Sequence, residues 1–303
     1  MERIDFSGRV AIVTGAGGGL GRLHALGLAE RGAKVVVNDL GGAVDGSGGS
    51  ATAAQKVVDE IRAKGGEAIA SGASVTDFDA VQAMVQQAID QWGRVDVVVN
   101  NAGILRDKSF AKMDLADFRL VLDVHLMGAV HLNKAVWPHM VAQKYGRILM
   151  TTSSTGLYGN FGQSNYGAAK LALVGLMQTL GLEGAKHDIR VNCLAPTAAT
   201  RMTEGLLPPE VMAAIRPEAV VPAMLVAVCE QAPTRTIFCA GAGTYEVAHI
   251  TLTRGLHLGL VADTPERLLA ALDHVRDRAD EAVPQSGSEQ GGNEVAQALA
   301  ARR

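Results

Sequence analysis

The sequence is poor in several residue types, and each shortage excludes a class of protein. Its 303 residues include three cysteines, Cys193, Cys229 and Cys239, without Cys-x-x-Cys spacing. This odd number argues against a disulfide framework and favours a reducing compartment. The formal net charge of −3 gives no basic surface for nucleic acid or an anionic membrane. No apolar run reaches the about 18 residues that a membrane-spanning helix needs.

The ends of the sequence lack targeting signals of two common kinds. Residues 1–8 contain acidic side chains and no apolar stretch, unlike a signal peptide. The sequence ends in Ala-Ala-Arg-Arg and not in the peroxisomal signal Ser-Lys-Leu. We therefore expect a cytoplasmic protein. The chain is 48% hydrophobic and 19% charged, which is typical of a globular protein with a full core.

Apolar runs that predict strands alternate with helical patterns along most of the chain. The strands are expected at residues 10–14, 34–38, 67–75, 95–99, 145–150, 189–194 and 236–240. This alternation predicts an α/β fold, a doubly wound parallel sheet of the Rossmann-like type in a single domain. We place a dinucleotide-binding catalytic domain at residues 1–260. Residues 261–303 are expected to form a C-terminal tail, an extension that is helical and partly disordered.

A glycine-rich segment follows the first expected strand and opens a helix. It reads Thr-Gly-Ala-Gly-Gly-Gly-Leu-Gly over residues 14–21. In this context glycines let the backbone approach a pyrophosphate, and the helix N-terminus offers free amides and a positive dipole. We expect contacts from Gly15, Gly19, Leu20 and Gly21. The segment therefore predicts a dinucleotide cofactor.

The ends of other strands are expected to contact the same cofactor. Asp39 follows the second strand, where an acid binds the adenosine ribose and repels a 2′-phosphate, so it predicts NAD and not NADP. A turn or cap aspartate is the alternative. No metal ion is expected. Further cofactor contacts are expected from Ser74 and Val75 after the third strand and from Asn101, Ala102 and Gly103 after the fourth.

Ser153, Tyr166 and Lys170 are the candidate catalytic residues. Tyr166 and Lys170 are four positions apart, so on a helix both side chains lie on one face. An ammonium beside a phenol favours the phenolate, which makes the tyrosine a usable general base. Ser153 follows an apolar run, at the carboxyl end of a strand where open α/β sheets bind ligands. Taken alone, the Tyr-x-x-x-Lys pair also fits an ordinary surface helix.

Four motifs together resemble the short-chain dehydrogenase/reductase family. They are Thr-Gly-x-x-x-Gly-x-Gly at 14–21, Asn-Asn-Ala-Gly at 100–103, Ser153, and Tyr-x-x-x-Lys at 166–170. The resemblance covers roughly residues 5–260. Within the family, further segments are similar to the (3R)-hydroxyacyl-CoA dehydrogenases of type 2 peroxisomal multifunctional enzymes, also described as 17β-hydroxysteroid dehydrogenases. These segments are 38–42, 103–107, 124–126, 144–147, 157–163 and 240–243.

The resemblance implies an enzyme of lipid metabolism that oxidises a secondary alcohol with NAD. Ser153 would bind the substrate oxygen, and Tyr166 would take the hydroxyl proton. Lys170 would lower the tyrosine pKa and, with Tyr166, contact the nicotinamide ribose. The loop after residues 189–194 would contact nicotinamide through Ala199 and Thr200. The implied substrate is a (3R)-hydroxyacyl-CoA, including one with a steroid acyl part.

Several alternatives stay open from the sequence. The substrate could instead be a free hydroxysteroid or another small alcohol. A protein of another class, a non-catalytic NAD-binding regulator, would keep the fold without the reaction. Arg106, Lys108 and Arg201 could contact CoA phosphates or be solvated.

Three positions depart from the family pattern. His125 stands where the family often has asparagine, and it could hold a water in a proton relay through Lys170 or simply pack the helix. Ser74 replaces an aspartate that often precedes the third-strand valine. Thr197 replaces the usual glycine after Pro196.

The expected partners are a small-molecule substrate and further copies of the chain. The family commonly pairs through helices expected here at 116–141 and 166–187, so we predict a homodimer or homotetramer. Neither nucleic acid nor membrane is expected as a partner.

Overall fold

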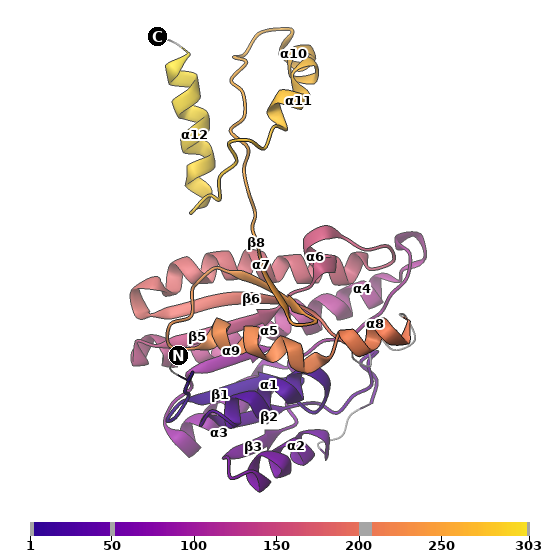
Figure 1. Ribbon diagram of the computed structural model, residues 1–303, viewed down its shortest axis with the longest axis vertical. Helices are drawn as coiled ribbons and strands as arrows, with labels where there is room; N and C mark the ends of the chain where they lie inside the picture. Colours follow the sequence, from indigo (N-terminus) through magenta and orange to yellow (C-terminus); the bar gives the residue numbers. More distant parts are fainter. Residues whose placement is uncertain (1–2, 49–51, 200–207, 302–303) are drawn as a thin grey trace. The chain divides into compact units, whose positions relative to one another are not determined.

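The computed structural model describes residues 3–48, 52–199 and 208–301 (Figure 1). Its contacts divide the chain into two compact units, Met1–Val247 and Ala248–Arg303. The assignment of a catalytic domain to residues 1–260 and an extension to residues 261–303 stays a prediction. None of the described helices combines the length and the apolarity needed to span a bilayer.

An eight-stranded sheet forms the centre of the first unit (Figure 1). The spatial order is β3-β2-β1-β4-β5-β6-β7-β8, and the six pairings from β3 across to β7 are parallel. The predicted doubly wound parallel sheet is therefore confirmed. The strands are β1 (Val10–Thr14), β2 (Lys34–Asn38), β3 (Ala68–Ser71), β4 (Val97–Asn100), β5 (Gly146–Thr151), β6 (Ile189–Thr197), β7 (Ile237–Gly241) and β8 (Thr244–Ala248).

The strand order reverses between β1 and β4, which creates the site for a ligand. The chain builds β1, β2 and β3 outward on one side and then returns to place β4 on the other side of β1. At such a switch point the loops after neighbouring strands diverge and leave a crevice at their carboxyl ends. Every residue of β1, β4 and β5 is buried, because helices cover both faces of the central strands.

Two layers of helices cover the sheet. One layer contains α1, α2 and α9, in which α1 contacts both other helices, and the other contains α3, α4, α5 and α7. Their bounds are α1 (Gly19–Ala29), α2 (Thr52–Ala63), α3 (Phe78–Trp92), α4 (Leu115–Leu122), α5 (Gly128–Gln143), α7 (Ser164–Gly184) and α9 (Val221–Val228). Two shorter helices, α6 (Ser154–Tyr158) and α8 (Pro209–Ala214), and the 3₁₀ turns Phe110–Lys112, Ala185–His187 and Pro217–Val220 lie in the connections.

Local sequence signals explain where several elements stop. Asp77 caps α3 by accepting the Ala80 amide, and Gly93 ends it at φ 78°, a left-handed conformation that glycine adopts readily. The strand predicted over residues 67–75 is shorter, because β3 ends at Ser71. There the Asn38 side-chain amide donates to the carbonyl oxygens of Ser71 and Ala73, at 3.3 and 2.9 Å. This turns the chain toward α3.

The second unit carries α10 (Thr264–Ala270), α11 (Leu272–Val275) and α12 (Gly287–Ala300), with an isolated antiparallel bridge between Leu252 and Ala282. None of its described residues is buried, and Leu260 and Leu269 are 96% and 73% exposed. A unit of this size normally folds around an apolar core. The described part of this unit has none of its own.

Candidate active site

The candidate site residues lie after the carboxyl ends of β1, β4 and β5, at the switch point. Thr14 ties two of these ends together. Its hydroxyl accepts the amides of Asn101 and Ala102, at 3.0 and 3.1 Å. The Asn101 side chain donates back to the carbonyl oxygens of Thr14 and Gly15, at 3.0 and 3.2 Å. The loops after β1 and β4 are thus fixed before any ligand binds.

Only glycine fits at several positions of the glycine-rich loop between β1 and α1. Gly15 and Gly19 adopt φ 63° and 51°, conformations that strain other residues. A Cβ at Gly21 would overlap the Gly15 carbonyl oxygen. The backbone therefore folds tightly at the N-terminus of α1 and presents its free amides. Leu20 lies in the first turn of this helix.

Asp39 is already fixed by backbone amides. Its Oδ2 accepts the Gly17 amide at 2.7 Å, and its Oδ1 accepts the Gly41 amide at 2.6 Å. The turn role that the sequence left as an alternative is therefore present in the structure. Each carboxylate oxygen retains a second acceptor position, so binding of an adenosine ribose stays a prediction. A Cβ at Gly17 would lie 2.8 Å from Oδ2, which explains the glycine.

The remaining predicted cofactor contacts occupy different surroundings. Ser74 is linked by its hydroxyl to Thr76, at 2.8 Å. Val75 is buried, and its carbonyl oxygen lies 2.9 Å from His131 Nδ1. The Ala199 amide donates to Ile215, which joins the end of β6 to the residue after α8. Thr200 and Arg201 lie outside the described residues. The cofactor roles of these positions stay predictions.

Ser153 is both the cap of α6 and a neighbour of the reactive tyrosine. Its hydroxyl oxygen accepts the Thr155 amide at 3.2 Å. This leaves the hydroxyl proton free to point elsewhere, and a hydrogen bond from Ser153 lowers the pKa of Tyr166. The structure thus brings Ser153 and Tyr166 together, and their catalytic roles stay predictions.

The net pKa shift of Tyr166 differs from the sequence expectation. Burial raises this pKa above its usual value of 10.0. The hydrogen bond from Ser153 lowers it by less, and the negative charge of Asp107 raises it slightly further. Removing the phenolate from water is costly, and this cost exceeds the stabilisation of the phenolate by the Ser153 hydrogen bond. The lysine effect that the sequence predicted is not among these causes.

Lys170 is buried on α7 and points toward the end of β5. Its Nζ donates to the Thr151 carbonyl oxygen at 2.5 Å and lies 5.5 Å from the centroid of the Tyr166 ring. Burial lowers the pKa of Lys170 to about 7, and Cys193 on β6 partly opposes the shift. The lysine is therefore poised between its charged and neutral forms near neutral pH, which is the range useful in acid–base chemistry.

The loop after β4 is joined to the start of α7 by contacts that the sequence did not predict. Gln163 donates to the Asp107 carboxylate at 2.7 Å, and Asn165 donates to the Arg106 carbonyl oxygen at 3.0 Å. The Lys108 amide donates to the Gly162 carbonyl oxygen at 2.9 Å. The segments 103–107 and 157–163 carried a signal as family-like motifs, but their pairing could not be read from one sequence. These bonds fix the approach to Tyr166.

The basic side chains near the site are paired. Arg106 and Lys108 both reach Asp117 of α4, with N–O distances of 3.0 and 3.7 Å. A role for them in binding phosphate would compete with these ion pairs. Among the described residues, no group of three or more histidine, cysteine or acidic side chains is arranged to hold a metal ion.

Comparisons with known proteins identify similar chains. The model of the short chain dehydrogenase family matches residues 9–210. Peroxisomal multifunctional enzyme A of Dictyostelium discoideum is 47% identical over 288 residues, which are 94% of this chain and 64% of that protein.

Two solved structures are also similar. Full-length peroxisomal multifunctional enzyme type 2 from Drosophila melanogaster has a TM-score of 0.80 and 36% identity, covering 97% of this chain and 50% of that one. A 7α-hydroxysteroid dehydrogenase complexed with NADH and 7-oxo glycochenodeoxycholic acid has a TM-score of 0.71 and 32% identity, covering 79% and 95%. The chain thus spans about half to two thirds of the two multifunctional relatives.

Proposed function

The chain belongs to the short-chain dehydrogenase family, and we propose that it oxidises the secondary alcohol of a (3R)-hydroxyacyl-CoA to the 3-ketoacyl-CoA with NAD. The observation that carries this proposal is the cluster of Ser153, Tyr166 and Lys170 after the end of β5. A serine hydroxyl, a buried phenol and a lysine with a pKa of about 7 are the groups that hold an alcohol and remove its proton.

The residues present fit a dinucleotide cofactor. Glycines at 15, 17 and 21 leave no space for a Cβ, so the loop forms a cradle of backbone at the start of α1. Asp39 would hold the adenosine ribose and disfavour a 2′-phosphate, and Lys170 with Tyr166 would hold the nicotinamide ribose. When bound, the nicotinamide supplies the hydride acceptor.

The protein's own groups handle the proton. Ser153 donates to the oxygen of the alcohol and fixes its orientation, while Tyr166 as phenolate takes the hydroxyl proton. Lys170 as ammonium stabilises the phenolate. Since burial raises the pKa of Tyr166 in the free protein, positive charge near the phenol is needed for reaction near neutral pH.

The substrate class rests on the relatives. The segments that resemble the (3R)-hydroxyacyl-CoA dehydrogenases of type 2 peroxisomal multifunctional enzymes support an acyl-CoA substrate, and two of the similar proteins are named as peroxisomal multifunctional enzymes. The similar 7α-hydroxysteroid dehydrogenase supports the alternative of a free hydroxysteroid. The intact cluster of Ser153, Tyr166 and Lys170 speaks against a non-catalytic regulator.

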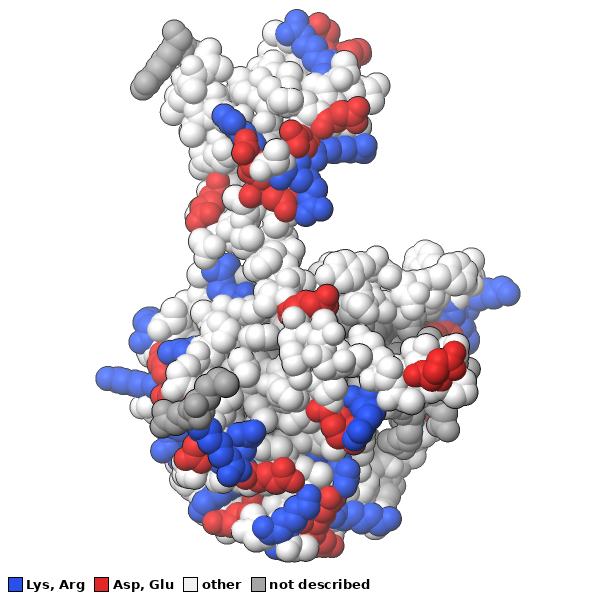
Figure 2. Space-filling view, in the orientation of Figure 1, with Lys and Arg blue, Asp and Glu red and all other residues white. Residues whose placement is uncertain are grey.

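Self-association is part of the proposal. Leu171 and Leu182 on α7 are 45% and 49% exposed, and exposed leucines on a helix fit a homodimer or homotetramer interface. Figure 2 shows basic and acidic side chains interspersed on the face in view.

A cytoplasmic location stays a prediction. The names of two similar proteins describe them as peroxisomal.

The proposal is tested by measuring NAD⁺ reduction with a (3R)-hydroxyacyl-CoA, its (3S) enantiomer and a free 17β-hydroxysteroid. We expect the (3R) thioester to have the highest kcat/KM and NADP⁺ to be a poor substitute. Preference for the free steroid would refute the CoA assignment and leave the mechanism intact.

Replacement of the tyrosine tests the mechanism directly. Tyr166→Phe removes the proton acceptor, so kcat should fall by about 10²–10⁴ or more, with little change in NAD affinity measured by titration. A variant that kept most of its turnover would exclude Tyr166 as the base.

A further inference from the structure

The short helix α6 places Ser153 and lies directly on α7. Ser153 is its N-cap, and a helix of five residues has too few internal hydrogen bonds to hold its position alone. The two helices approach closely, because a Cβ at Gly156 would lie 2.8 Å from Lys170 Cβ. The separation of Ser153 from Tyr166 therefore depends on the contacts that join α6 to α7.

The side chain of Gln163 makes such a contact. Gln163 is the N-cap residue of α7, yet its side chain forms no capping hydrogen bond. Its Oε1 instead accepts the Thr155 hydroxyl and the Asn160 side-chain amide, both at 3.0 Å. Thr155 in turn donates its backbone amide to the Ser153 hydroxyl oxygen at 3.2 Å. A chain of hydrogen bonds thus leads from the start of α7 to Ser153.

The other end of the Gln163 amide fixes its orientation. Its Nε2 donates to the Asp107 carboxylate at 2.7 Å. An ionised carboxylate only accepts hydrogen bonds, so the NH₂ group must face Asp107 and Oε1 must face Thr155. A hydrogen bond to a charged acceptor is also stronger than one between neutral groups. Gln163 therefore holds the loop after β4, α6 and α7 in one arrangement.

We propose that Gln163 is a positioning residue for the alcohol oxidation, and that it acts through Thr155 to keep the Ser153 hydroxyl directed at Tyr166 and the substrate oxygen. The inference rests on the function proposed above. The Thr155 amide occupies one side of the serine oxygen, so the hydroxyl proton points to the other side. Without Gln163 the first turn of α6 is free to move, and the serine donates in the productive direction for less of the time.

Several titratable groups surround Tyr166, and the substitutions below keep all of them. His125 lies on the widened, π-helical turn Asp123–Met127 and meets the tyrosine ring edge to face, with centroids 5.2 Å apart. Its Nε2 lies 2.8 Å from the carbonyl oxygen of Ile104. Burial lowers the pKa of His125 well below 6.5, so it is neutral at pH 7. The other groups are Lys170, Cys193 beside it, Asp107, and Asp117 with its partners Arg106 and Lys108.

The first test is the pH dependence of kcat and kcat/KM for wild type, Gln163→Leu and Thr155→Val. In Gln163→Leu we expect the plateau of kcat to fall by about 10–100-fold, because the alcohol is less well oriented. Loss of the Ser153 hydrogen bond raises the pKa of Tyr166, so the acid limb should move up by about one pH unit, about tenfold on that limb. NAD affinity should change little.

Thr155→Val separates the two ends of the Gln163 amide. It removes the hydroxyl that Gln163 accepts, but it keeps the volume, the backbone amide bound to Ser153 and the bond between Gln163 and Asp107. Its kcat and acid limb should change in the same direction as in Gln163→Leu and by less. Such a shift cannot come from movement of the Asp107 charge.

The matched control is Gln86→Leu. Gln86 on α3 donates to Asp90 at 2.7 Å, so this variant also removes a glutamine bound to an aspartate and should match wild type. The double variant Ser153→Ala/Gln163→Leu should equal Ser153→Ala in kcat and in its acid limb, because Gln163 acts through Ser153. Additive losses would overturn the inference.

A second measurement does not depend on turnover. Hydrogen exchange of the Thr155 amide should be about tenfold faster in folded Gln163→Leu than in wild type and unchanged in Gln86→Leu. Equal rates in Gln163→Leu would overturn the inference whatever the activity. Wild-type kcat with an unmoved acid limb in that variant would also overturn it, with the proposed function intact. A wild type that oxidised no alcohol would refute the proposed function, and the exchange rates would then decide whether Gln163 holds α6.

Discussion

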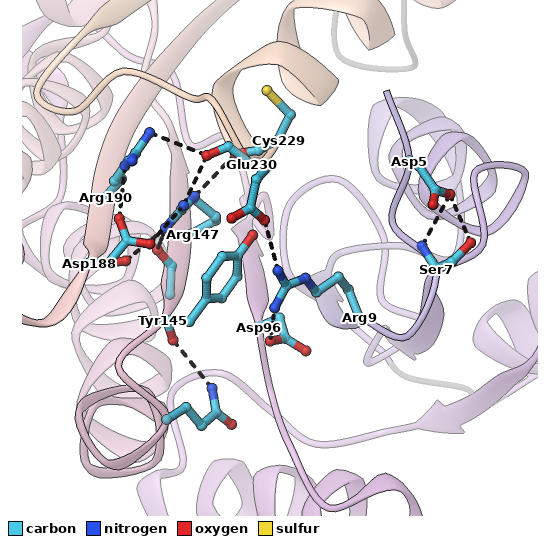
Figure 3. A network of polar contacts seen from close by, with 12 residues as sticks. Asp5, Ser7, Arg9, Asp96, Tyr145, Arg147, Asp188, Arg190, Cys229 and Glu230 are labelled. Atoms are coloured by element: carbon cyan, nitrogen blue, oxygen red, sulfur yellow. Dashed lines mark hydrogen bonds and ion pairs between the residues drawn. The ribbon is translucent and has the colours of Figure 1, made fainter. Parts of the chain in front are cut away.

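Replacement of Arg147 should weaken the fold markedly. It lies at the amino end of β5, opposite to Ser153, and is fully buried. Five hydrogen bonds use all five of its N–H donors. They reach the carbonyl oxygens of Gly146, Asp188, Cys229 and Glu230 at 2.7–3.1 Å and the Asp188 carboxylate at 3.1 Å (Figure 3). A buried guanidinium is tolerated because every donor is satisfied.

Tyr145 connects this arginine to a second one. Its ring lies between the two guanidinium groups, with Arg147 4.1 Å and Arg9 3.8 Å from the ring centroid (Figure 3). Arg9 also pairs with Glu230 at 2.7 Å. Burial raises the pKa of Tyr145 to about 12 in spite of both cations, so the phenol is neutral. We call Arg9, Tyr145, Arg147, Asp188 and Glu230 the amino-edge network.

The perturbation is Arg147→Met, which keeps apolar volume but removes every donor. The side chain of Asp188 is 40% exposed, so loss of the ion pair itself contributes little, but each buried carbonyl left without a donor costs about 1–3 kcal/mol. These losses overlap, so we expect unfolding to become easier by about 3–5 kcal/mol. At about 2–4 °C per kcal/mol for a domain of this size, Tm falls by roughly 6–20 °C.

The assay is thermal and urea unfolding followed by circular dichroism. Arg147→Lys keeps the charge but loses the planar fork, so its stability should lie between those of wild type and Arg147→Met. Arg216→Gln breaks an exposed pair with Glu218, 3.6 Å apart, and should unfold like wild type. Folded Arg147→Met should retain its turnover at 25 °C. A loss under about 1 kcal/mol, the range of exposed pairs, would refute the reasoning.

Two further predictions concern the pH dependence of stability. Lys170→Met should abolish turnover yet raise Tm, because the pKa of Lys170 falls from 10.5 to about 7 on folding. The charged lysine therefore destabilises the folded state by roughly 3–5 kcal/mol below pH 7, and this destabilisation decreases as the pH rises to 10.5. Equal Tm values of the variant and wild type at pH 6 would contradict this prediction. His24 is buried without a described partner, and burial lowers its pKa from 6.5 to about 4. Wild type should therefore lose stability as pH falls from 6.5 to 4, and His24→Leu should lose less; parallel acid-unfolding curves would exclude this.

The fold could be predicted from sequence because its signals are local. Apolar strands alternate with helices, and central parallel strands are apolar throughout, as in β4. Gly15 and Gly21 were recognisable because only glycine fits a tight turn against a helix start. The Tyr166–Lys170 spacing depends only on the helical period. Each of these features is encoded within a few residues.

Features that depend on tertiary contacts could not be predicted in this way. In the sequence Arg147 is only a polar residue within an expected strand. Its acceptors, the carbonyl oxygens of Asp188, Cys229 and Glu230, lie far from it in the sequence and could not be predicted. The widened turn at Asp123–Met127 has no sequence signature, yet it decides where His125 points. The predicted direction of the Tyr166 pKa shift was wrong for the same reason. Burial has the largest effect on this pKa, and burial depends on the tertiary structure.

Buried polar groups at the amino ends of the central strands thus differ from those at the carboxyl ends in whether their hydrogen bonds are satisfied. At the amino edge, Arg147 has every donor paired, which favours the folded state. At the carboxyl edge, Lys170 is desolvated, and His125 Nδ1 and Thr151 Oγ1 are buried without partners among the described residues. Buried polar groups that are placed to bind a ligand lower the stability of the folded protein. The stability provided by the amino-edge network offsets that cost, so weakening Arg147 should make the enzyme less tolerant of any further substitution at its active site.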